Sequence, residues 1–362
     1  MCWAFFTEGW GLFFSEELYN LSVLFSAALF SDRNASVAAL LWQYLVGGVS
    51  VTGLLWSALW VVAVRRYLAG GLCTSTARLT GQTVVITGAN VGIGKETARD
   101  LLRRGESYKK LLYYFKDKQV HLACCLSPGA HVILACRSLP KAEEARRSLL
   151  GEGGKVEVRL LDLSSLQSVR GFAAGLVKDN IKVHILINNA GVMMCPYMET
   201  QEGFEMQMGT NHLGHFLLTN LLLPQMKQHG EPARIINVSS LGHLSGEIDM
   251  DDLFFKKKPY DKVQAYANST QIQVFSLHPG SVHSALGRHI LSSVMNDYIL
   301  CLALKTTLEG AQTTVYCATQ AKQHSEMYFS DCAVGWALYA SKDERLAEDF
   351  WKLSAQLVKL DE

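Results

Sequence analysis

The chain has 362 residues, of which 49% are hydrophobic and 19% charged, and its formal net charge is +1. This length accommodates one large α/β domain with an appendage, or two domains, and the near-neutral charge excludes an obvious nucleic-acid surface. The nine cysteines are scattered and include no C-x-x-C pair. Neither a disulfide framework nor a metal site is therefore predicted, and a reducing compartment fits best.

The front of the chain contains a long uncharged run, residues 35–64. About 20 apolar residues suffice to cross a bilayer core, so the sequence predicts a transmembrane anchor at about 40–64, a buried core helix being the alternative. Arg65 and Arg66 follow this run directly. The positive-inside rule then places the C-terminal body in the cytosol and the first 40 or so residues on the lumenal side.

Two glycosylation sequons begin at Asn20 and Asn34, on the predicted lumenal side. No cleavable signal peptide is predicted. The chain is thus expected to consist of an N-terminal segment with its anchor, residues 1–80, and a catalytic body, residues 81–362.

The body opens with a pattern typical of dinucleotide binding. Residues 83–86 form a β-branched run that predicts a buried parallel strand. The glycine-rich turn 88–94 follows, and a helical pattern then continues through Leu102. Glycines allow the backbone to approach a pyrophosphate, whose charge the helix N-terminus stabilises. Any tight turn can carry three glycines, but this strand-to-helix context favours the dinucleotide site.

Six motifs extend this pattern along the chain: TGANVGIG, LDLSS, INNAGVMM, NHLGHF, INVSS and HPG. They occur in the order found in short-chain dehydrogenases/reductases, which the chain therefore resembles. The flanking AGGLCTS, GVMMCPY, EGAQTTVYCA and YFSDC resemble the microsomal retinol dehydrogenases of that family, from about Tyr67 to about Cys332.

The resemblance implies a single α/β domain of Rossmann type, with a doubly wound parallel sheet and the cofactor at the carboxyl ends of the strands. It also implies an oxidoreductase of the endoplasmic reticulum membrane that interconverts retinol and retinaldehyde, or related lipid aldehydes and alcohols. A homodimer is one expectation, although the helix after the tyrosine that relatives commonly use for dimer packing is a segment that this sequence largely lacks.

Arg137 ends the predicted second strand, residues 131–137, where relatives that prefer NAD carry an acidic residue. A guanidinium group suits a 2′-phosphate, so NADP(H) is predicted, an ordinary solvated arginine being the alternative. The resemblance assigns the remaining cofactor contacts to Gly88, Asn90, Gly92, Ile93, Gly94, Asp162, Leu163, Asn189, Ala190, Gly191, Pro279 and Gly280.

The catalytic group implied by the resemblance consists of Tyr266 as the acid/base, Ser240 as the donor to the substrate oxygen, and Asn211. Asn211 would order a proton-relay water, a helix cap being its alternative role. A free phenol has a pKa of about 10, and the family lysine four residues later lowers the pKa of the tyrosine by its charge. Here Thr270 stands at that position. Lys262, one turn before the tyrosine, is a conceivable but poorly directed substitute.

Two departures from the family pattern suggest alternative splicing or an imperfect gene sequence. Residues 106–129 form an insertion, and a segment is missing after Ser269. Tyr266 and His278 are therefore separated by only 12 positions, too few for a helix that returns along the sheet. Either the helix begins well before Tyr266, or the crossover is distorted. The alternative to an active enzyme is a catalytically impaired, nucleotide-binding relative; a tethered protein that binds no nucleotide is poorly supported.

Overall fold

The computed structural model describes residues 51–105, 129–228, 233–270, 276–289, 304–320, 328–336 and 343–361. The chain divides into two units, residues 1–65 and 66–362. The predicted insertion lies outside the described residues apart from Gly129, and both predicted lumenal sequons lie outside them entirely.

Helix α3 (Val51–Ala69) covers the second half of the predicted anchor, while residues 35–50 lie outside the described residues. Its apolar side chains, including Trp56, Trp60 and Val62, are exposed. Within the described ranges, no helix combines the length and the apolarity needed to cross a membrane.

The second unit is built on an eight-stranded sheet in the order β3-β2-β1-β4-β5-β6-β7-β8. Neighbouring strands are parallel, except that β7 and β8 are antiparallel. The order reverses between β1 and β4, which is the switch point of a doubly wound fold. The predicted fold class is confirmed. The strands are β1 (Thr83–Thr87), β2 (His131–Cys136), β3 (Lys155–Leu160), β4 (Ile185–Asn188), β5 (Arg234–Val238), β6 (Ser276–His278), β7 (Tyr328–Ser330) and β8 (Ala333–Val334).

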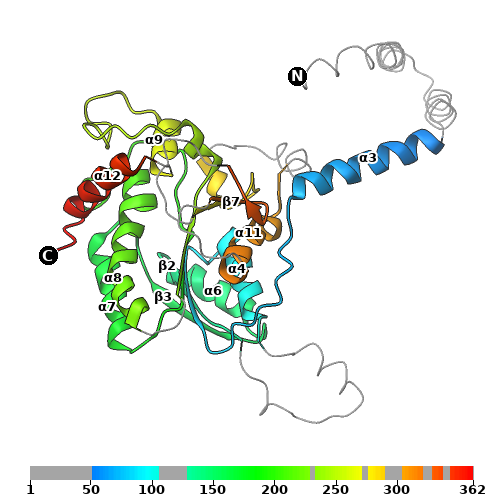
Figure 1. Cartoon of the computed structure of the whole chain (residues 1–362), viewed down its shortest axis with the longest axis horizontal. Helices are drawn as coiled ribbons and strands as arrows, with labels where there is room; N and C mark the ends of the chain where they lie inside the picture. The colour runs from blue at the N-terminus through cyan, green and yellow to red at the C-terminus, as the bar shows by residue number, and fades with distance from the viewer. Residues whose placement is uncertain are drawn as a thin grey trace, which may run out of the picture. The chain divides into compact units, whose positions relative to one another are not determined.

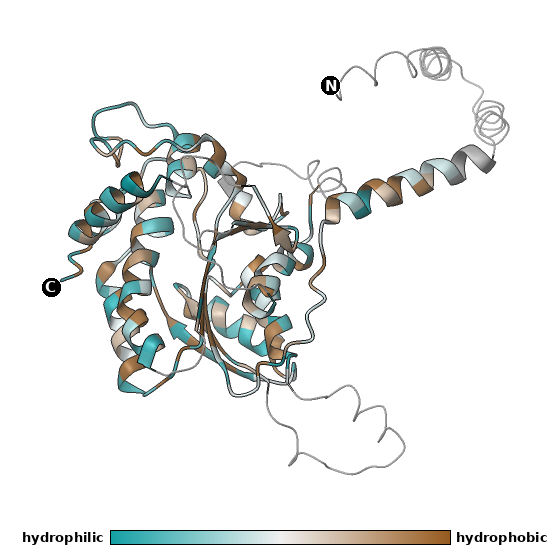
Figure 2. Cartoon of the chain, viewed as in Figure 1, coloured by the Kyte–Doolittle hydropathy of each residue, from teal (hydrophilic) through white to brown (hydrophobic). Residues whose placement is uncertain are grey.

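Helices cover both faces of this sheet (Figure 1). Val84 and Ile86 of β1 pack with apolar residues of α4 (Gly92–Leu102), α6 (Leu139–Leu149) and α11 (Thr307–Thr319). Val85 points to the other face, toward α7 (Leu166–Lys178) and α8 (Gly214–Gln228). Because both faces are covered, the central strands are largely apolar, and most of their length is coloured hydrophobic in Figure 2. The C-terminal helix α12 (Glu344–Leu357) packs on the η1 segment (Met208–Leu213) through Phe350.

The shortened crossover between β5 and β6 contains helix α9 (Lys262–Ser269). Asp261 caps this helix by accepting hydrogen bonds from the backbone N–H groups of Val263 and Gln264. Eight residues extend about 12 Å, less than the ~17–20 Å of an ordinary strand. The helix begins only four residues before Tyr266, so of the two alternatives the shortened crossover is the one that the described residues favour, and β6 keeps only three residues.

Candidate active site

A cavity of about 340 Å³ opens at the carboxyl ends of β4, β5 and β6. No Lys, Arg, Asp or Glu is among the described residues that line it. The cavity therefore suits an uncharged group, with polar contacts supplied by amides, hydroxyls and imidazoles. The predicted site residues in its lining are Ile93, Asn189, Ala190, Gly191, Asn211, Ser240, Tyr266, Pro279 and Gly280.

The glycine-rich turn between β1 and α4 has a conformation that only glycine readily adopts. Gly88 and Gly92 have φ angles of +67° and +64°. A Cβ atom at Gly88 would lie 2.9 Å from Cα of Ala190, and one at Gly94 would lie 2.5 Å from Nδ2 of Asn189. The turn therefore packs tightly against the chain after β4, and the N-cap residue Val91 makes no side-chain hydrogen bond to the first N–H groups of α4. This cradle fits a pyrophosphate.

The hydroxyl of Thr87, at the end of β1, connects this strand to the segment after β4 and to α8. It accepts hydrogen bonds from the N–H groups of Asn189 and Ala190, both 2.9 Å long, and lies 2.9 Å from Nε2 of His215. His215 is buried, which lowers its pKa to about 4, so a neutral ring accepts the Thr87 proton. Sequence reasoning missed this arrangement, since a Thr at a strand end and a His on a helix carry no motif of their own.

Seven of the thirteen predicted cofactor residues are absent from the cavity lining, and three of them lie outside the glycine turn. Arg137 lies exposed directly after β2, and the backbone hydrogen bond of 2.8 Å from Gly88 to Ala135 places that strand end beside the glycine turn. The carboxylate of Asp162 accepts hydrogen bonds from Ser164, and Leu163 is buried. Gly88, Asn90, Gly92 and Gly94 form the turn but are likewise absent from the cavity lining.

The structure brings Ser240 and Tyr266 together. Ser240 caps the short η2 helix (Leu241–Ser245), its hydroxyl accepting from the N–H of Gly242 at 3.1 Å. Ser240 and Tyr266 line the same cavity. Tyr266 is only 8% exposed, and burial raises its pKa, an effect that the nearby Ser240 side chain partly offsets. The phenol is thus protonated at neutral pH.

Asn211 lies inside the π-helical segment η1 (Met208–Leu213), rather than capping a helix. Its amide exchanges two hydrogen bonds with the backbone of Val192, at 2.8 and 2.9 Å, and donates a third to Ser269 at 3.0 Å. This one side chain therefore ties the segment after β4 to the end of α9.

Thr270 ends α9 and supplies no charge to the site. Its hydroxyl donates to the carbonyl of Ala267 at 3.0 Å, and its own carbonyl accepts from Ser239 at 2.9 Å. Lys262 lies exposed at the start of α9 and does not line the cavity. Among the described residues, then, no cation stands in the cavity beside Tyr266.

Comparison with known proteins agrees with this geometry. Residues 122–250 match the family model described as short chain dehydrogenase. The chain is 40% identical over 320 residues to retinol dehydrogenase 11 of Mus musculus, covering 82% of this chain and 92% of that protein. The chain belongs to the short-chain dehydrogenase family. It is accordingly an oxidoreductase of the NAD(P)-dependent class.

Other similar proteins point the same way. Retinol dehydrogenase 12 of Mus musculus is 39% identical over 324 residues, covering 82% of this chain and 92% of that one. Retinol dehydrogenase 14 of Mus musculus is 37% identical over 366 residues, with coverages of 90% and 98%. A crystal structure of a putative uncharacterized protein from Mycobacterium paratuberculosis superimposes with a TM-score of 0.56 at 32% identity, covering 80% of this chain and 98% of that one.

Proposed function

We propose that the chain is a membrane-anchored, NADP(H)-dependent oxidoreductase that interconverts an apolar alcohol and its carbonyl compound, retinol and retinaldehyde or a related lipid pair. The observation that carries this proposal is the placement of Ser240 and Tyr266 in one cavity that Asn189–Gly191 and Pro279–Gly280 also line. The names of the relatives, retinol dehydrogenases 11, 12 and 14, support the substrate class.

The chain's own residues would handle the proton of the reaction. A bound nicotinamide cofactor supplies the hydride. Ser240 orients the carbonyl oxygen, and Tyr266 donates its phenolic proton to that oxygen. Because burial raises the pKa of Tyr266, the phenol holds the proton that carbonyl reduction requires, whereas alcohol oxidation requires the disfavoured phenolate. Reduction is therefore the proposed preferred direction at neutral pH.

The choice of NADP(H) rests on Arg137, whose exposed guanidinium follows β2 beside the glycine turn. An always-charged, planar donor suits a 2′-phosphate. The proposal of an apolar substrate is based on the apolar part of the cavity lining. This part is formed by Met193, Val238, Leu241, Val282, Leu286 and Leu304.

The anchor is proposed from the sequence alone: thirty uncharged residues, 35–64, precede Arg65 and Arg66. A cytosolic body at the endoplasmic reticulum membrane follows from that polarity. Such an enzyme would bind an apolar substrate that is dissolved in the same bilayer that anchors the enzyme.

The decisive experiment measures NADPH binding and retinaldehyde reduction by the purified chain in detergent. We expect Tyr266→Phe to reduce kcat at least about 100-fold with unchanged NADPH affinity, because it removes only the transferred proton. Gly94→Ala should weaken NADPH binding, since its Cβ would meet Asn189. Gly171→Ala is the matched control, because nothing lies within 4 Å of a Cβ there. Activity that survives in Tyr266→Phe would contradict the proposed proton donor.

A second function, nucleotide binding with impaired turnover, is favoured by one observation: Thr270 is bonded to backbone carbonyls, and none of the described residues that line the cavity brings an ammonium group to Tyr266. A typical acid/base contribution is about 10²–10⁴-fold. Tight NADPH binding together with undetectable reduction of any lipid aldehyde would favour this second function.

A further inference from the structure

An ionised pair lies directly behind the wall of the uncharged cavity. Lys305 is 6% exposed, and its ammonium group pairs with the carboxylate of Asp331. Gly280 separates this pair from the cavity: a Cβ there would lie 2.6 Å from Cδ and Cε of Lys305 and 2.9 Å from its Nζ. The absence of a side chain at Gly280 is what allows the ammonium group to approach so closely.

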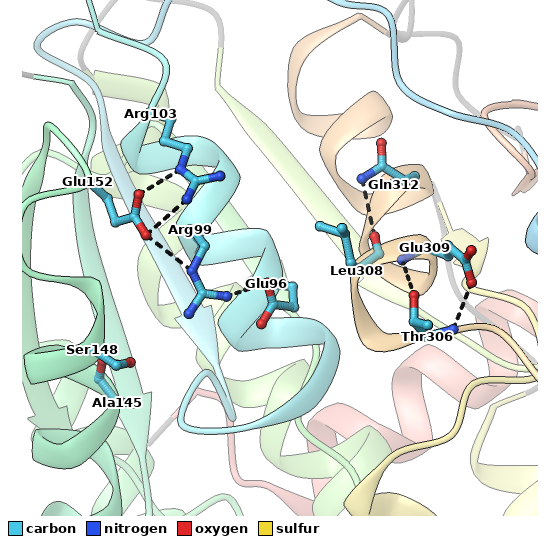
Figure 3. A network of polar contacts seen from close by, with 10 residues as sticks. All are labelled: Glu96, Arg99, Arg103, Ala145, Ser148, Glu152, Thr306, Leu308, Glu309 and Gln312. Carbon is cyan, nitrogen blue, oxygen red and sulfur yellow. Dashed lines mark hydrogen bonds and ion pairs between the residues drawn. The ribbon is translucent and has the colours of Figure 1, made fainter. Parts of the chain in front are cut away.

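Backbone contacts fix the position of Lys305. Its N–H donates to the carbonyl of Ser281 at 2.8 Å, and its own carbonyl accepts from the N–H of His283 at 2.9 Å. The next residue begins a capping box, in which Thr306 and Glu309 cap the start of α11 reciprocally (Figure 3). The ammonium group is thus held behind Gly280 by ordered chain on both sides.

His278 lies beside this pair and in the cavity lining. It ends β6, where it is in register with Ser330, the residue before Asp331. The side chain is 7% exposed, and its Nδ1 is buried without a hydrogen-bond partner. A buried imidazole nitrogen that lacks a partner is costly, and it is costlier still when the ring is charged.

We propose that Lys305, held in place by its ion pair with Asp331, is a positioning residue that keeps the imidazole of His278 uncharged in the cavity wall, so that the cavity accepts the positively charged oxidised nicotinamide ring as well as the neutral reduced one. This inference rests on the proposed use of a nicotinamide cofactor. A protonated His278 would repel the oxidised ring and leave the reduced ring almost unaffected.

The charges around His278 have opposite signs. Its pKa is lowered to about 4, chiefly by burial and next by Lys305; Asp331 raises it, and His243 lowers it slightly. His243 approaches from η2, Asp331 from the end of β7, and Lys305 from the chain before α11. Removal of Lys305 therefore raises the pKa of His278, and removal of Asp331 lowers it, although either change breaks the same ion pair.

Because the two substitutions should change the pKa of His278 in opposite directions, they distinguish an electrostatic role of Lys305 from a purely structural one. We expect NMR titration of His278 in the full-length protein to show a pKa at least about one unit higher in Lys305→Met, a tenfold change in proton affinity, and no increase in Asp331→Asn. Lys305→Arg should restore the original value, and His278→Asn assigns the signal. Equal shifts in Lys305→Met and Asp331→Asn would overturn the proposal, since they would report broken packing alone.

Cofactor affinities provide the second measurement. From about pH 8 to about pH 5, the ratio of the Kd values for NADP⁺ and NADPH should stay nearly constant in the original protein and in Asp331→Asn. It should rise roughly twofold in Lys305→Met, because a pKa raised by about one unit from about 4 leaves about half of the His278 rings protonated at pH 5, and like charges repel in a cavity of low dielectric. A ratio that is independent of pH in Lys305→Met would refute the inference. Absence of all cofactor binding would instead refute the proposed function, while the NMR titration would still test His278.

Discussion

At position 270 a threonine hydroxyl replaces the ammonium group that the family pattern leads one to expect. The hydroxyl donates to the carbonyl of Ala267, and the residue is 5% exposed. Thr270 is thus a packed helix end rather than a vacant position. A longer, charged side chain there would have to displace its neighbours before it could approach Tyr266.

We therefore expect Thr270→Lys alone to raise kcat/KM for retinaldehyde reduction less than about tenfold, well below a full acid/base contribution. It should also lower Tm, because it buries a charge without a partner. Steady-state kinetics and thermal unfolding measure the two effects, and Thr270→Val controls for loss of the hydroxyl. A gain of more than about 100-fold would show that charge alone was missing.

How far single residues could be predicted depends on whether their partners lie within one motif. Ser240 and Tyr266 stand in recognisable motifs, and the structure places them in one cavity. The partners of Asn211 could not be foreseen, because Val192 and Ser269 lie 19 and 58 positions away. The ion pair of Lys305 likewise depends on how separate strands come together.

At the scale of elements, α12 supports η1, the segment that carries Asn211. The ring of His212 stacks on Phe350 with centroids 4.5 Å apart, and its Nε2 lies 2.9 Å from the hydroxyl of Ser354. Burial lowers the pKa of His212 to about 4, from an ordinary 6.5. The unfolded chain therefore binds a proton more readily than the folded one between those values.

Stability should accordingly fall as the pH drops from about 6.5 toward 4, by about 1.4 kcal/mol per pH unit for each such histidine. We expect His212→Phe, which keeps an aromatic ring against Phe350, to make Tm less dependent on pH in this range. Thermal unfolding followed at pH 7 and at about pH 5 measures the change. His283→Gln is the control, since His283 is exposed; equal pH dependence in both variants would contradict the assignment.

Elements were predictable where local pattern and burial agree. The apolar runs at 83–86 and 131–137 became β1 and β2 within one residue at their ends. The π-helical form of η1 was not predictable, since the bonds of Asn211 to Val192 and Ser269 join it to distant parts of the chain. The start of α9 at Lys262 reflects the Asp261 cap, a local signal that the sequence offers.

At the scale of the whole molecule, the membrane topology remains a prediction from charge and apolarity. Expressed with microsomes, the chain should gain mass that an endoglycosidase removes, and Asn20→Gln with Asn34→Gln together should abolish that gain. Protease added outside should digest the body and spare the glycosylated end. Glycans that persist in the double variant, or a body that is protected from protease, would contradict the proposed orientation and indicate the opposite one.

Both edges of the sheet are poor templates for a further strand. β8 has only two residues, and β3 alternates Val156 and Val158 with the charged Lys155, Glu157 and Arg159. Short and charged edge strands discourage the addition of strands from other chains. Crowded at a membrane surface, copies of this protein should therefore resist fusing into continuous intermolecular sheets, and any homodimer is expected to form through helices.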